Sequence, residues 1–472
     1  MTAPAAAAPF EPAGDMAFHA LGEQGILFSE GRQELHLLDA AASYVWCSIV
    51  EKIGLDEIAA TYAVACDIPR PEADRIVGDL LHRWLGLGYA RGAPVRSATP
   101  IDLTTAIGRL LVNPALRASF AADPGATADW LRLREDDIPM FVGIDPVQLD
   151  RMAEAGAENA DETVTDAVIE SAILRYRTRP WTPPRAARYY RLAGTTLRVG
   201  FDTPDQEARI HSAFAHLETE SGPADLAVDV IAEKQGHVVL MDGKPVGFCD
   251  RIDRLARTVL VPVRDSVVDR EKYFLLIHAG LVSNGAACVL LPAAPGSGKS
   301  TLAAALARAG FGFFTDEIAM LDGGTMAARP FPFPIVVKQG SMAPLLGPYP
   351  GLADLPLALR DNDQPVRYLP PPASSPPTDA TCRQPVRWIV FPRYDRAGPT
   401  ELRQLPPEQA FARLLRECRI VKARLDRGNV AGLIEWLGNV ACYDLPLSSL
   451  PEAVTLLQLL CGVSPPPRVG QD

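Results

Sequence analysis

The first 95 residues change from short apolar runs to helical spacing. Runs at residues 25–28 and 34–38 flank the turn-forming sequence Ser-Glu-Gly, which predicts a small hairpin. Apolar residues at helical intervals follow in three segments, at residues 41–53, 55–63 and 70–87. A hairpin with three helices is typical of a winged-helix domain, and we expect one over residues 17–95.

The rest of the chain divides into a helical segment and a longer mixed segment. Residues 100–178 contain no His or Cys, and their spacing predicts a scaffold domain with helices at 107–120, 146–155 and 168–176. Residues 185–462 alternate between strand and helix patterns after an opening set of β-rich runs, at residues 197–201, 226–231, 237–241 and 259–263. The expected fold class is multidomain, α+β and α/β, with this last segment as an α/β domain.

Proline clusters mark the expected boundaries between these segments. The chain has 43 prolines, and the groups at residues 180–184 and 370–377 predict a linker and an exposed loop. We expect a disordered tail over residues 1–16 and a second tail over residues 463–472.

Composition narrows the functional classes. The 472 residues include 46 Lys and Arg against 57 Asp and Glu, a net charge of −11. This acidic balance argues against a nucleic-acid partner, since phosphate contacts need a basic face. No apolar stretch reaches the roughly 18 residues of a membrane span, and residues 1–14 lack the basic start of a signal peptide. Eight cysteines without CxxC spacing predict buried, reduced thiols, and we expect a cytoplasmic protein with no membrane partner.

The strongest chemical signal is a glycine loop between a short strand and a helix. An apolar strand at residues 287–291 leads into it, and a helix at residues 301–309 follows at once, closed by Gly310. In this setting the backbone N–H groups and the helix N-terminus converge on phosphate oxygens. The predicted nucleotide-binding residues are Ala293, Ala294, Pro295, Gly296, Ser297, Gly298, Lys299, Ser300 and Thr301.

Three residues of this loop carry particular expectations. Lys299 is expected to reach the β- and γ-phosphates, and Ser300 offers its hydroxyl to Mg²⁺. Ala293 stands where the first glycine is usual, and because alanine is the smallest substitute we expect the loop to keep its shape. The expected cofactors are therefore ATP and Mg²⁺.

An acidic pair, Asp316 and Glu317, follows the helix at the end of the next predicted strand. Because parallel strands end at the same sheet edge, we expect both carboxylates beside the γ-phosphate. One can accept a proton from an attacking hydroxyl, and the other can hold Mg²⁺. A helix-capping role for the pair stays open.

A histidine is expected at the mouth of the loop. Asn284 and Gly285 give a two-residue hairpin signal, and pairing the strands about that turn places His278 opposite Leu291. At that position the imidazole can contact a phosphate or the acceptor. A structural role is equally open.

These pieces, in this order and spacing, resemble the HPr kinase family. The resemblance rests on His278-Ala-Gly-Leu-Val, on the loop from Ala293 to Ser300, and on Thr315 with the acidic pair. It implies that Asp316 is the base toward an acceptor serine, and that Lys299 and His278 are also catalytic. Glu317 stands in place of the family's second Asp, and it is expected to bind Mg²⁺ together with Ser300.

The resemblance extends loosely further along the chain. Residues 330–338 and 388–394 look like the HPr-kinase-related subgroup, and Lys338 and Arg393 are either phosphate-neutralising or ordinary surface charges. The glycine-rich signature of the family's phosphorylase reaction is absent from the sequence. This argues against a bifunctional regulator of sugar uptake.

The N-terminal segment resembles the PqqD-like family, small winged-helix modules that hold leader peptides of ribosomally made, modified peptides. The matching stretches are at residues 37–46, 54–59 and 79–89. This resemblance implies that a peptide binds as an added strand beside the hairpin.

Together, the two resemblances imply an ATP- and Mg²⁺-dependent kinase acting on a hydroxyl of a peptide or small protein. The expected substrate is a Ser of a ribosomally made precursor peptide held by the N-terminal domain. The alternative is a nucleotide-gated peptide-binding protein without productive phosphotransfer, and a third possibility is a regulatory protein kinase of the HPr type. The kinase relatives are often multimeric, so a homo-oligomer is possible.

Overall fold

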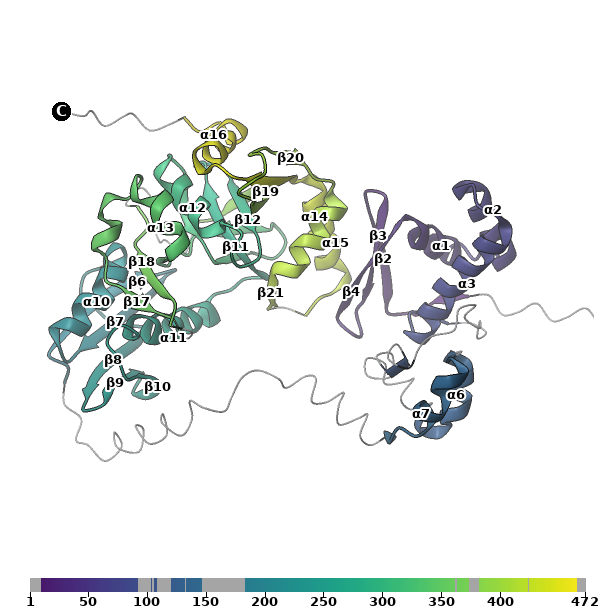
Figure 1. The fold of residues 1–472 in the computed structure, drawn as a ribbon, viewed down its shortest axis with the longest axis horizontal. Coiled ribbons are helices and arrows are strands. Elements are labelled where there is room, and N and C mark those ends of the chain that lie inside the picture. The colour runs from purple at the N-terminus through teal and green to yellow at the C-terminus, as the bar shows by residue number, and fades with distance from the viewer. Residues whose placement is uncertain are drawn as a thin grey trace, which may run out of the picture. The chain divides into compact units, whose positions relative to one another are not determined.

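We describe the protein from a computed structural model. The described residues are 10–91, 103, 106–107, 120–131, 133–146, 183–360, 363–372, 382–422 and 424–464. Contacts divide the chain into two compact units, an N-terminal unit (Met1–Glu162) and a C-terminal unit (Thr163–Asp472). Both contain helices and sheets, as expected for a mixed α and β protein, and Figure 1 shows their elements.

A three-stranded antiparallel sheet with the order β2-β3-β4 lies in the N-terminal unit (Figure 1). The strands are β2 (Met16–Leu21), β3 (Gln24–Ser29) and β4 (Glu34–Leu38). The predicted hairpin is present as β3 and β4. Strand β2 was missed because only Met16 and Leu21 at its two ends are buried, which leaves no alternating apolar pattern.

Three helices follow close to their predicted positions, α1 (Ala40–Val50), α2 (Leu55–Cys66) and α3 (Arg70–Gly86). The Asp39 carboxylate caps α1 by accepting a hydrogen bond from the Ala42 N–H at 2.7 Å. Trp46 and Trp84 pack edge to face with ring centres 5.1 Å apart and join α1 to α3.

The expected disordered tail over residues 1–16 is wrong for residues 10–16. Strand β1 (Glu11–Pro12) pairs antiparallel with β5 (Ala90–Arg91), and Phe10 is buried in the core of the unit. A two-residue strand that contains proline has too few positions to show a strand pattern and could not be predicted.

The middle segment contains α6 (Pro124–Leu131), the short turn η1 (Glu135–Asp137) and α7 (Ile138–Val142). Phe120 and Phe141 pack edge to face with ring centres 4.9 Å apart and form the centre of a small core. The helices predicted at residues 107–120, 146–155 and 168–176 lie almost wholly outside the described residues.

The C-terminal unit begins with a five-stranded sheet of order β10-β9-β8-β7-β6. Its strands are β6 (Ala186–Leu192), β7 (Thr195–Phe201), β8 (Leu226–Glu233), β9 (Gly236–Met241) and β10 (Lys244–Cys249). Helices α10 (Pro204–Phe214) and α11 (Leu255–Arg270) pack on one face of this sheet, and the turn η2 (Ala215–Leu217) extends α10. Three of the four predicted β-rich runs fall in these strands.

The fourth predicted run, residues 259–263, is wrong, because it lies inside helix α11. Its β-branched residues favour a strand locally. The buried positions of α11, however, include a stripe spaced four residues apart, at Leu255, Val259, Val263 and Val267. Burial of this helical stripe outweighs the local preference.

A second sheet of nine strands contains the glycine loop and the acidic pair. Its order is β12-β11-β14-β15-β19-β22-β20, and β13 and β21 also pair with β11. The strands are β11 (Leu275–Ser283), β12 (Cys288–Pro292), β13 (Gly312–Thr315), β14 (Ile318–Leu321), β15 (Ala327–Arg329), β19 (Gln384–Tyr394), β20 (Arg403–Gln404), β21 (Cys418–Val421) and β22 (Ala441–Leu447).

A third, three-stranded sheet and six further helical elements complete the unit (Figure 1). Its strands are β16 (Ile335–Lys338), β17 (Ala358–Leu359) and β18 (Pro365–Leu369). The helical elements are α12 (Lys299–Arg308), α13 (Gln339–Leu346), η3 (Pro350–Asp354), α14 (Pro407–Glu417), α15 (Arg427–Asn439) and α16 (Leu450–Cys461). Helix α12 is buried among β12, β13 and α16.

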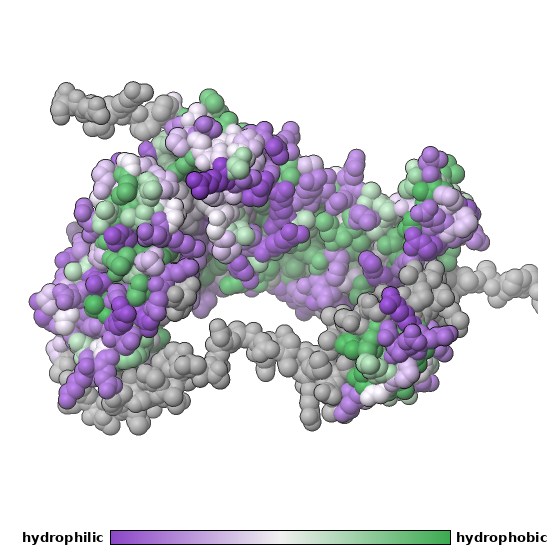
Figure 2. All heavy atoms as spheres, viewed as in Figure 1, coloured by the Kyte–Doolittle hydropathy of each residue, from purple (hydrophilic) through white to green (hydrophobic). Residues whose placement is uncertain are grey.

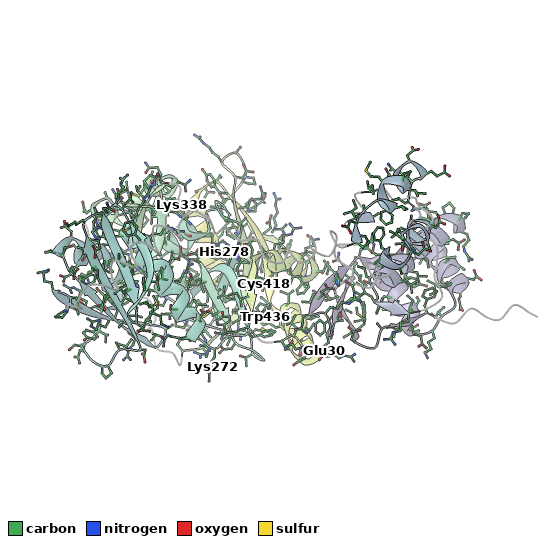
Figure 3. The ribbon with its side chains drawn as sticks, turned by 90° about the horizontal axis from the view of Figure 1, so that it is seen from below. Glu30, Lys272, His278, Lys338, Cys418 and Trp436 are labelled. Carbon is green, nitrogen blue, oxygen red and sulfur yellow. The ribbon has the colours of Figure 1, made fainter. Side chains whose placement is uncertain are left out.

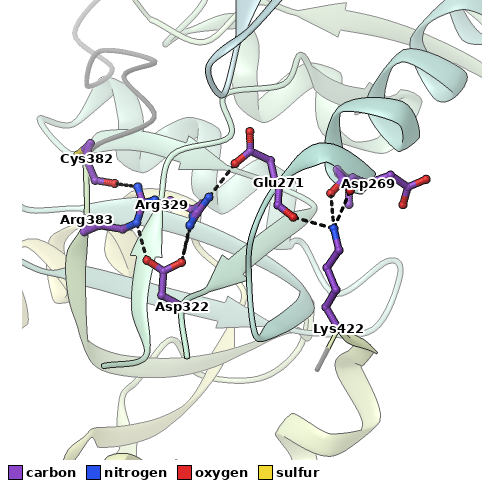
Figure 4. A network of polar contacts seen from close by, with 8 residues as sticks. Asp269, Glu271, Asp322, Arg329, Cys382, Arg383 and Lys422 are labelled. Atoms are coloured by element: carbon purple, nitrogen blue, oxygen red, sulfur yellow. Dashed lines mark hydrogen bonds and ion pairs between the residues drawn. The ribbon is translucent and has the colours of Figure 1, made fainter. Parts of the chain in front are cut away.

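A network of polar contacts, centred on the buried Arg329, ties several of these elements together (Figure 4). The Arg329 guanidinium is 2.7 Å from a Glu271 carboxylate oxygen and 2.6 Å from an Asp322 carboxylate oxygen. Asp322 also accepts a hydrogen bond from Arg383. The Lys422 ammonium donates to the backbone oxygens of Asp269 and Glu271, so the chain just after β21 is held to the end of α11.

The surface and the helices bear on two expectations from composition, the absence of a membrane span and the burial of the cysteines. Figure 2 shows hydrophilic residues over much of the visible face, interrupted by smaller hydrophobic areas. In the described part of the chain, no helix is long and apolar enough to cross a membrane. All eight cysteines are free thiols. Four are buried, but Cys66 is exposed and three are intermediate, so the prediction of buried thiols holds only in part.

The network around Arg329 predicts a large stability effect. Arg329→Met removes the cation between two carboxylates, of which Glu271 is nearly buried, and should cost about 3–5 kcal/mol of unfolding free energy. Arg403→Met, which removes an exposed pair with Glu401, should cost under about 1 kcal/mol. Urea denaturation of both variants measures the difference, and equal midpoints would contradict the assignment.

Candidate nucleotide-binding site

Strand β11 lies at the centre of the site, with two strands in succession along each of its edges. On one edge β12 pairs with it from Ser283 to Ala279, and β21 then pairs from Ile277 to Leu275. On the other edge β13 and β14 follow each other in nearly continuous register, with the acidic pair between them. On both edges, therefore, the partner strand of β11 changes at the same position along β11, around His278 to Gly280. The neighbouring segments turn away from β11 at that position.

This arrangement brings the glycine loop and the acidic pair to the same level of the sheet. We use the term glycine loop for residues 293–298, which directly follow β12. The Ala279 N–H donates to the Glu317 carbonyl at 3.2 Å, so the acidic pair is held opposite the middle of β11. Both β12 and β13 run antiparallel to β11, and they are therefore parallel to each other, as the sequence predicts. The acidic pair interrupts a longer strand, however, and does not end it.

The predicted hairpin register is wrong by two residues. Ser283 pairs with Cys288, and Leu291 lies opposite Gly280, while His278 pairs with Ile318 on the other edge. A two-residue turn of the expected type needs positive φ at both central residues. Only Gly285 has one. The Asn284 side-chain oxygen instead accepts hydrogen bonds from the N–H groups of Ala286 and Ala287, at 3.0 and 2.8 Å, which gives a longer loop.

The glycine loop has the backbone that its sequence predicts. Gly296 has a φ of 90° and Gly298 a φ of 89°, a region that other residues rarely adopt. Gly298 is the N-cap of α12, so the first N–H groups of that helix face the loop. Ala293 is buried and is not among the residues with positive φ, which explains why alanine fits there.

Lys299 is held inside the loop by two backbone oxygens. Its ammonium donates to the carbonyls of His278 and Ala293, both at 3.4 Å. Burial lowers the pKa of Lys299 to about 8, although the charges of Asp316 and Glu317 oppose the shift. A cation that is largely out of water and held by long hydrogen bonds is available to a phosphate.

Asp316 is almost completely buried and accepts a hydrogen bond from the Ser300 hydroxyl. Burial, with the neighbouring Glu317, raises the pKa of Asp316 to about 7, while Ser300 and Lys299 oppose the shift. The predicted base and the predicted Mg²⁺-binding serine are therefore in direct contact. Near neutral pH this carboxyl group is poised between its two protonation states.

Glu317 and His278 have partners that the sequence did not predict. A Glu317 carboxylate oxygen is 3.4 Å from the Arg264 guanidinium of α11, and the side chain is 43% exposed. The His278 Nδ1 is 3.2 Å from a Glu417 carboxylate oxygen at the end of α14. Burial, followed by the charge of Lys299, lowers the pKa of His278. Figure 3 labels His278 on β11 near Cys418, the first residue of β21.

These residues border one cleft with a volume of about 1140 Å³. This volume is slightly above the roughly 300–1,000 Å³ that is typical of a pocket for one small molecule. Its cationic side chains outnumber its three carboxylates, which are Asp265, Asp316 and Glu317; the cations are Arg257, Arg264, Lys299, Lys338, Arg360 and Arg419. Lys338 thus lies at the cleft, whereas Arg393 is paired with Asp395 at 3.6 Å and does not line it.

The donors present fit a Mg²⁺ ion that is held partly by phosphate. Within the described ranges, no group of three or more His, Cys, Asp or Glu is arranged to hold a metal. Mg²⁺ at phosphate sites takes only one or two protein ligands, together with substrate phosphates and water. The Ser300 hydroxyl and the Glu317 carboxylate, which both line the cleft, are the donors that the sequence predicts for this ion.

Sequence reasoning missed three residues that line the cleft, Arg264, Tyr394 and Arg419, and it also missed Glu417, the partner of His278. Arg264 was missed because its segment was interpreted as a strand. Glu417 and Arg419 lie more than 130 positions from His278, and only the pairing of β21 with β11 brings them together. Tyr394 follows a recognisable strand, and its position at the end of that strand was the available signal.

No protein-family model matches the chain, and no curated protein matches it.

If the glycine loop binds the nucleotide, alanine substitutions at Gly296 and at Gly432 should affect MgATP affinity very differently. A Cβ added at Gly296 meets no atom within 4 Å, so Gly296→Ala acts only through its positive φ. That strain is about 1–2 kcal/mol and should weaken MgATP binding by roughly 5- to 30-fold in calorimetry. Gly432→Ala in α15, which is equally uncrowded but has no positive φ, should leave binding unchanged. Equal affinities of the two variants would argue against the loop as the binding element.

Because the pKa of Asp316 is raised, replacing this residue by a neutral one should stabilise the fold, by an amount that depends on pH. The unfolded chain ionises this carboxyl near 3.8, but the folded protein keeps the proton until about pH 7. Folding stability from this group therefore falls as the pH rises through that window. Asp316→Asn should be more stable than the wild type by a few kcal/mol at pH 8. At pH 5 the variant should still be more stable, but by a smaller amount. Thermal melts at both pH values measure this, and an Asn variant that is less stable at pH 8 would contradict the burial argument.

Proposed function

We propose that the C-terminal unit is an ATP- and Mg²⁺-dependent kinase that transfers the γ-phosphate to a serine hydroxyl of a peptide or small protein. One observation carries this proposal. The glycine loop and the acidic pair lie at the same position along β11, one on each edge of that strand. A phosphate cradle and a buried carboxylate of raised pKa thus border the same cleft.

The chain's own residues supply binding, orientation and proton transfer. The loop N–H groups and Lys299 hold the phosphates, and bound Mg²⁺ neutralises charge on them. The acceptor oxygen attacks the γ-phosphorus in line. The bond between the γ-phosphorus and the oxygen that bridges it to the β-phosphate breaks, and ADP leaves. Asp316 takes the hydroxyl proton, so the transfer rate should rise as the pH increases through about 7.

The N-terminal unit is proposed to hold the substrate peptide. Strands β2 and β4 are the edges of its three-stranded sheet, and an edge strand is where an extended peptide adds by backbone hydrogen bonding. A leader bound there raises the effective concentration of the attached acceptor at the kinase site. The proposed partner is therefore a precursor peptide with separate leader and acceptor segments.

Mass spectrometry of candidate precursor peptides, incubated with the full chain and MgATP, tests the proposal. Wild-type protein should add one phosphate mass, and Lys299→Ala should abolish the addition because the phosphates lose their buried cation. Asp316→Asn should reduce it by at least two orders of magnitude, the usual contribution of a general base.

Matched variants separate the two carboxylates. Glu317→Gln tests the exposed member of the pair, and Glu435→Gln on the outer surface of α15 should have no effect. Full transfer by Asp316→Asn would reject Asp316 as the base. MgATP and leader binding without any phosphate gain would instead support a nucleotide-gated peptide-binding protein.

A further inference from the structure

Three parallel strands end beside the glycine loop, and only the first of them leads into it. Strand β12 pairs parallel with β19, and β19 pairs parallel with β22. In sheets of this kind, ligands bind outside the carboxyl ends of the strands. The ends of β19 and β22, at Tyr394 and Leu447, are therefore next to the phosphate cradle.

The acidic pair and Tyr394 lie on opposite sides of the loop. Across the sheet the order is β13, β11, β12, β19 and β22, with the loop rising from β12 in the middle. Asp316, at the end of β13, marks the side of the phosphate that is transferred. A triphosphate is a linear chain, so its nucleoside end points the other way, toward β19 and β22.

Tyr394 is fixed to the loop by its backbone while its ring stays open to the cleft. The Tyr394 N–H donates to the Ser297 carbonyl at 3.0 Å, and its Cβ is 3.7 Å from the position of a Cβ built on Gly298. The residue is 54% exposed, unusual for a large aromatic side chain, and it lines the cleft. Its hydroxyl has no hydrogen-bond partner among the described residues.

Residues 447–451, from the end of β22 into the start of α16, lie beside Tyr394 and are equally well fixed. The backbone N–H groups of Ser448 and Ser449 both donate to the Thr400 hydroxyl, at 3.0 and 2.9 Å. The Asp395 N–H donates to the Leu447 carbonyl at 2.9 Å, which joins the end of β22 to the residue after Tyr394. Leu447 to Pro451 line the cleft together with Tyr394.

We propose that Tyr394 is the stacking platform for the nucleotide base, with residues 448–451, which lead from β22 into α16, as a second wall of the base site. This inference rests on nucleotide binding at the glycine loop, as in the proposed function, but it does not require phosphotransfer. An aromatic ring accepts any base, so the site selects for a nucleoside triphosphate and discriminates little between bases.

Calorimetry with MgATP and with magnesium tripolyphosphate, on the full chain, tests the inference. Tripolyphosphate has the phosphates but no base. Tyr394→Ala should weaken MgATP binding roughly 5- to 150-fold, the range for loss of one base stack, and leave tripolyphosphate affinity unchanged. Tyr394→Phe keeps the ring and should bind both ligands as the wild type does. Lys299→Ala should weaken both.

The outcomes separate this inference from the proposed function. If Tyr394→Ala leaves MgATP affinity unchanged, or weakens both ligands equally, Tyr394 is not the base platform although the loop still binds phosphate. If the wild type binds neither ligand, both the inference and the proposed function are overturned. If Tyr394→Ala lowers MgATP affinity alone but no peptide is phosphorylated, the base site stands and only the kinase assignment fails.

Discussion

The site depends on one constraint, the exchange of partner strands along both edges of β11. A strand has only two edges, and here each is used twice, by β12 and β21 on one and by β13 and β14 on the other. Where the partners change, around His278 to Gly280, the backbone is released for the glycine loop on one edge and the acidic pair on the other. Gly280 itself leaves room for Lys299, since an added Cβ would lie 3.4 Å from the lysine Cγ.

The electrostatics of the site follow from that geometry. Lys299 and Asp316 are both buried, and each shifts toward its neutral form, with pKa values of about 8 and 7. Such a pair is a poor source of stability but is suited to proton and phosphate chemistry near neutral pH. Arg329 and Lys422 anchor β15, β21 and α11 around the cleft through buried ion pairs and backbone oxygens.

Local features of the fold and site could be predicted from the sequence, but long-range ones could not. The glycine loop was visible because its glycines and its strand and helix are contiguous, and the three helices of the N-terminal unit show clear apolar spacing. The predicted register of His278 is wrong because Asn284 and Gly285 do not form a two-residue hairpin turn. The Asn284 side chain closes a longer loop instead. The contacts of Glu417 and Arg264 depend on pairings of distant segments, which leave no local pattern.

A crystal structure of the full chain with Mg²⁺ and a non-hydrolysable ATP analogue tests the central claim most directly. The account predicts the triphosphate on residues 293–300, the γ-phosphate on the Asp316 side of β12, and the base against Tyr394. A nucleotide bound elsewhere, or one with its base on the side of the acidic pair, would contradict it.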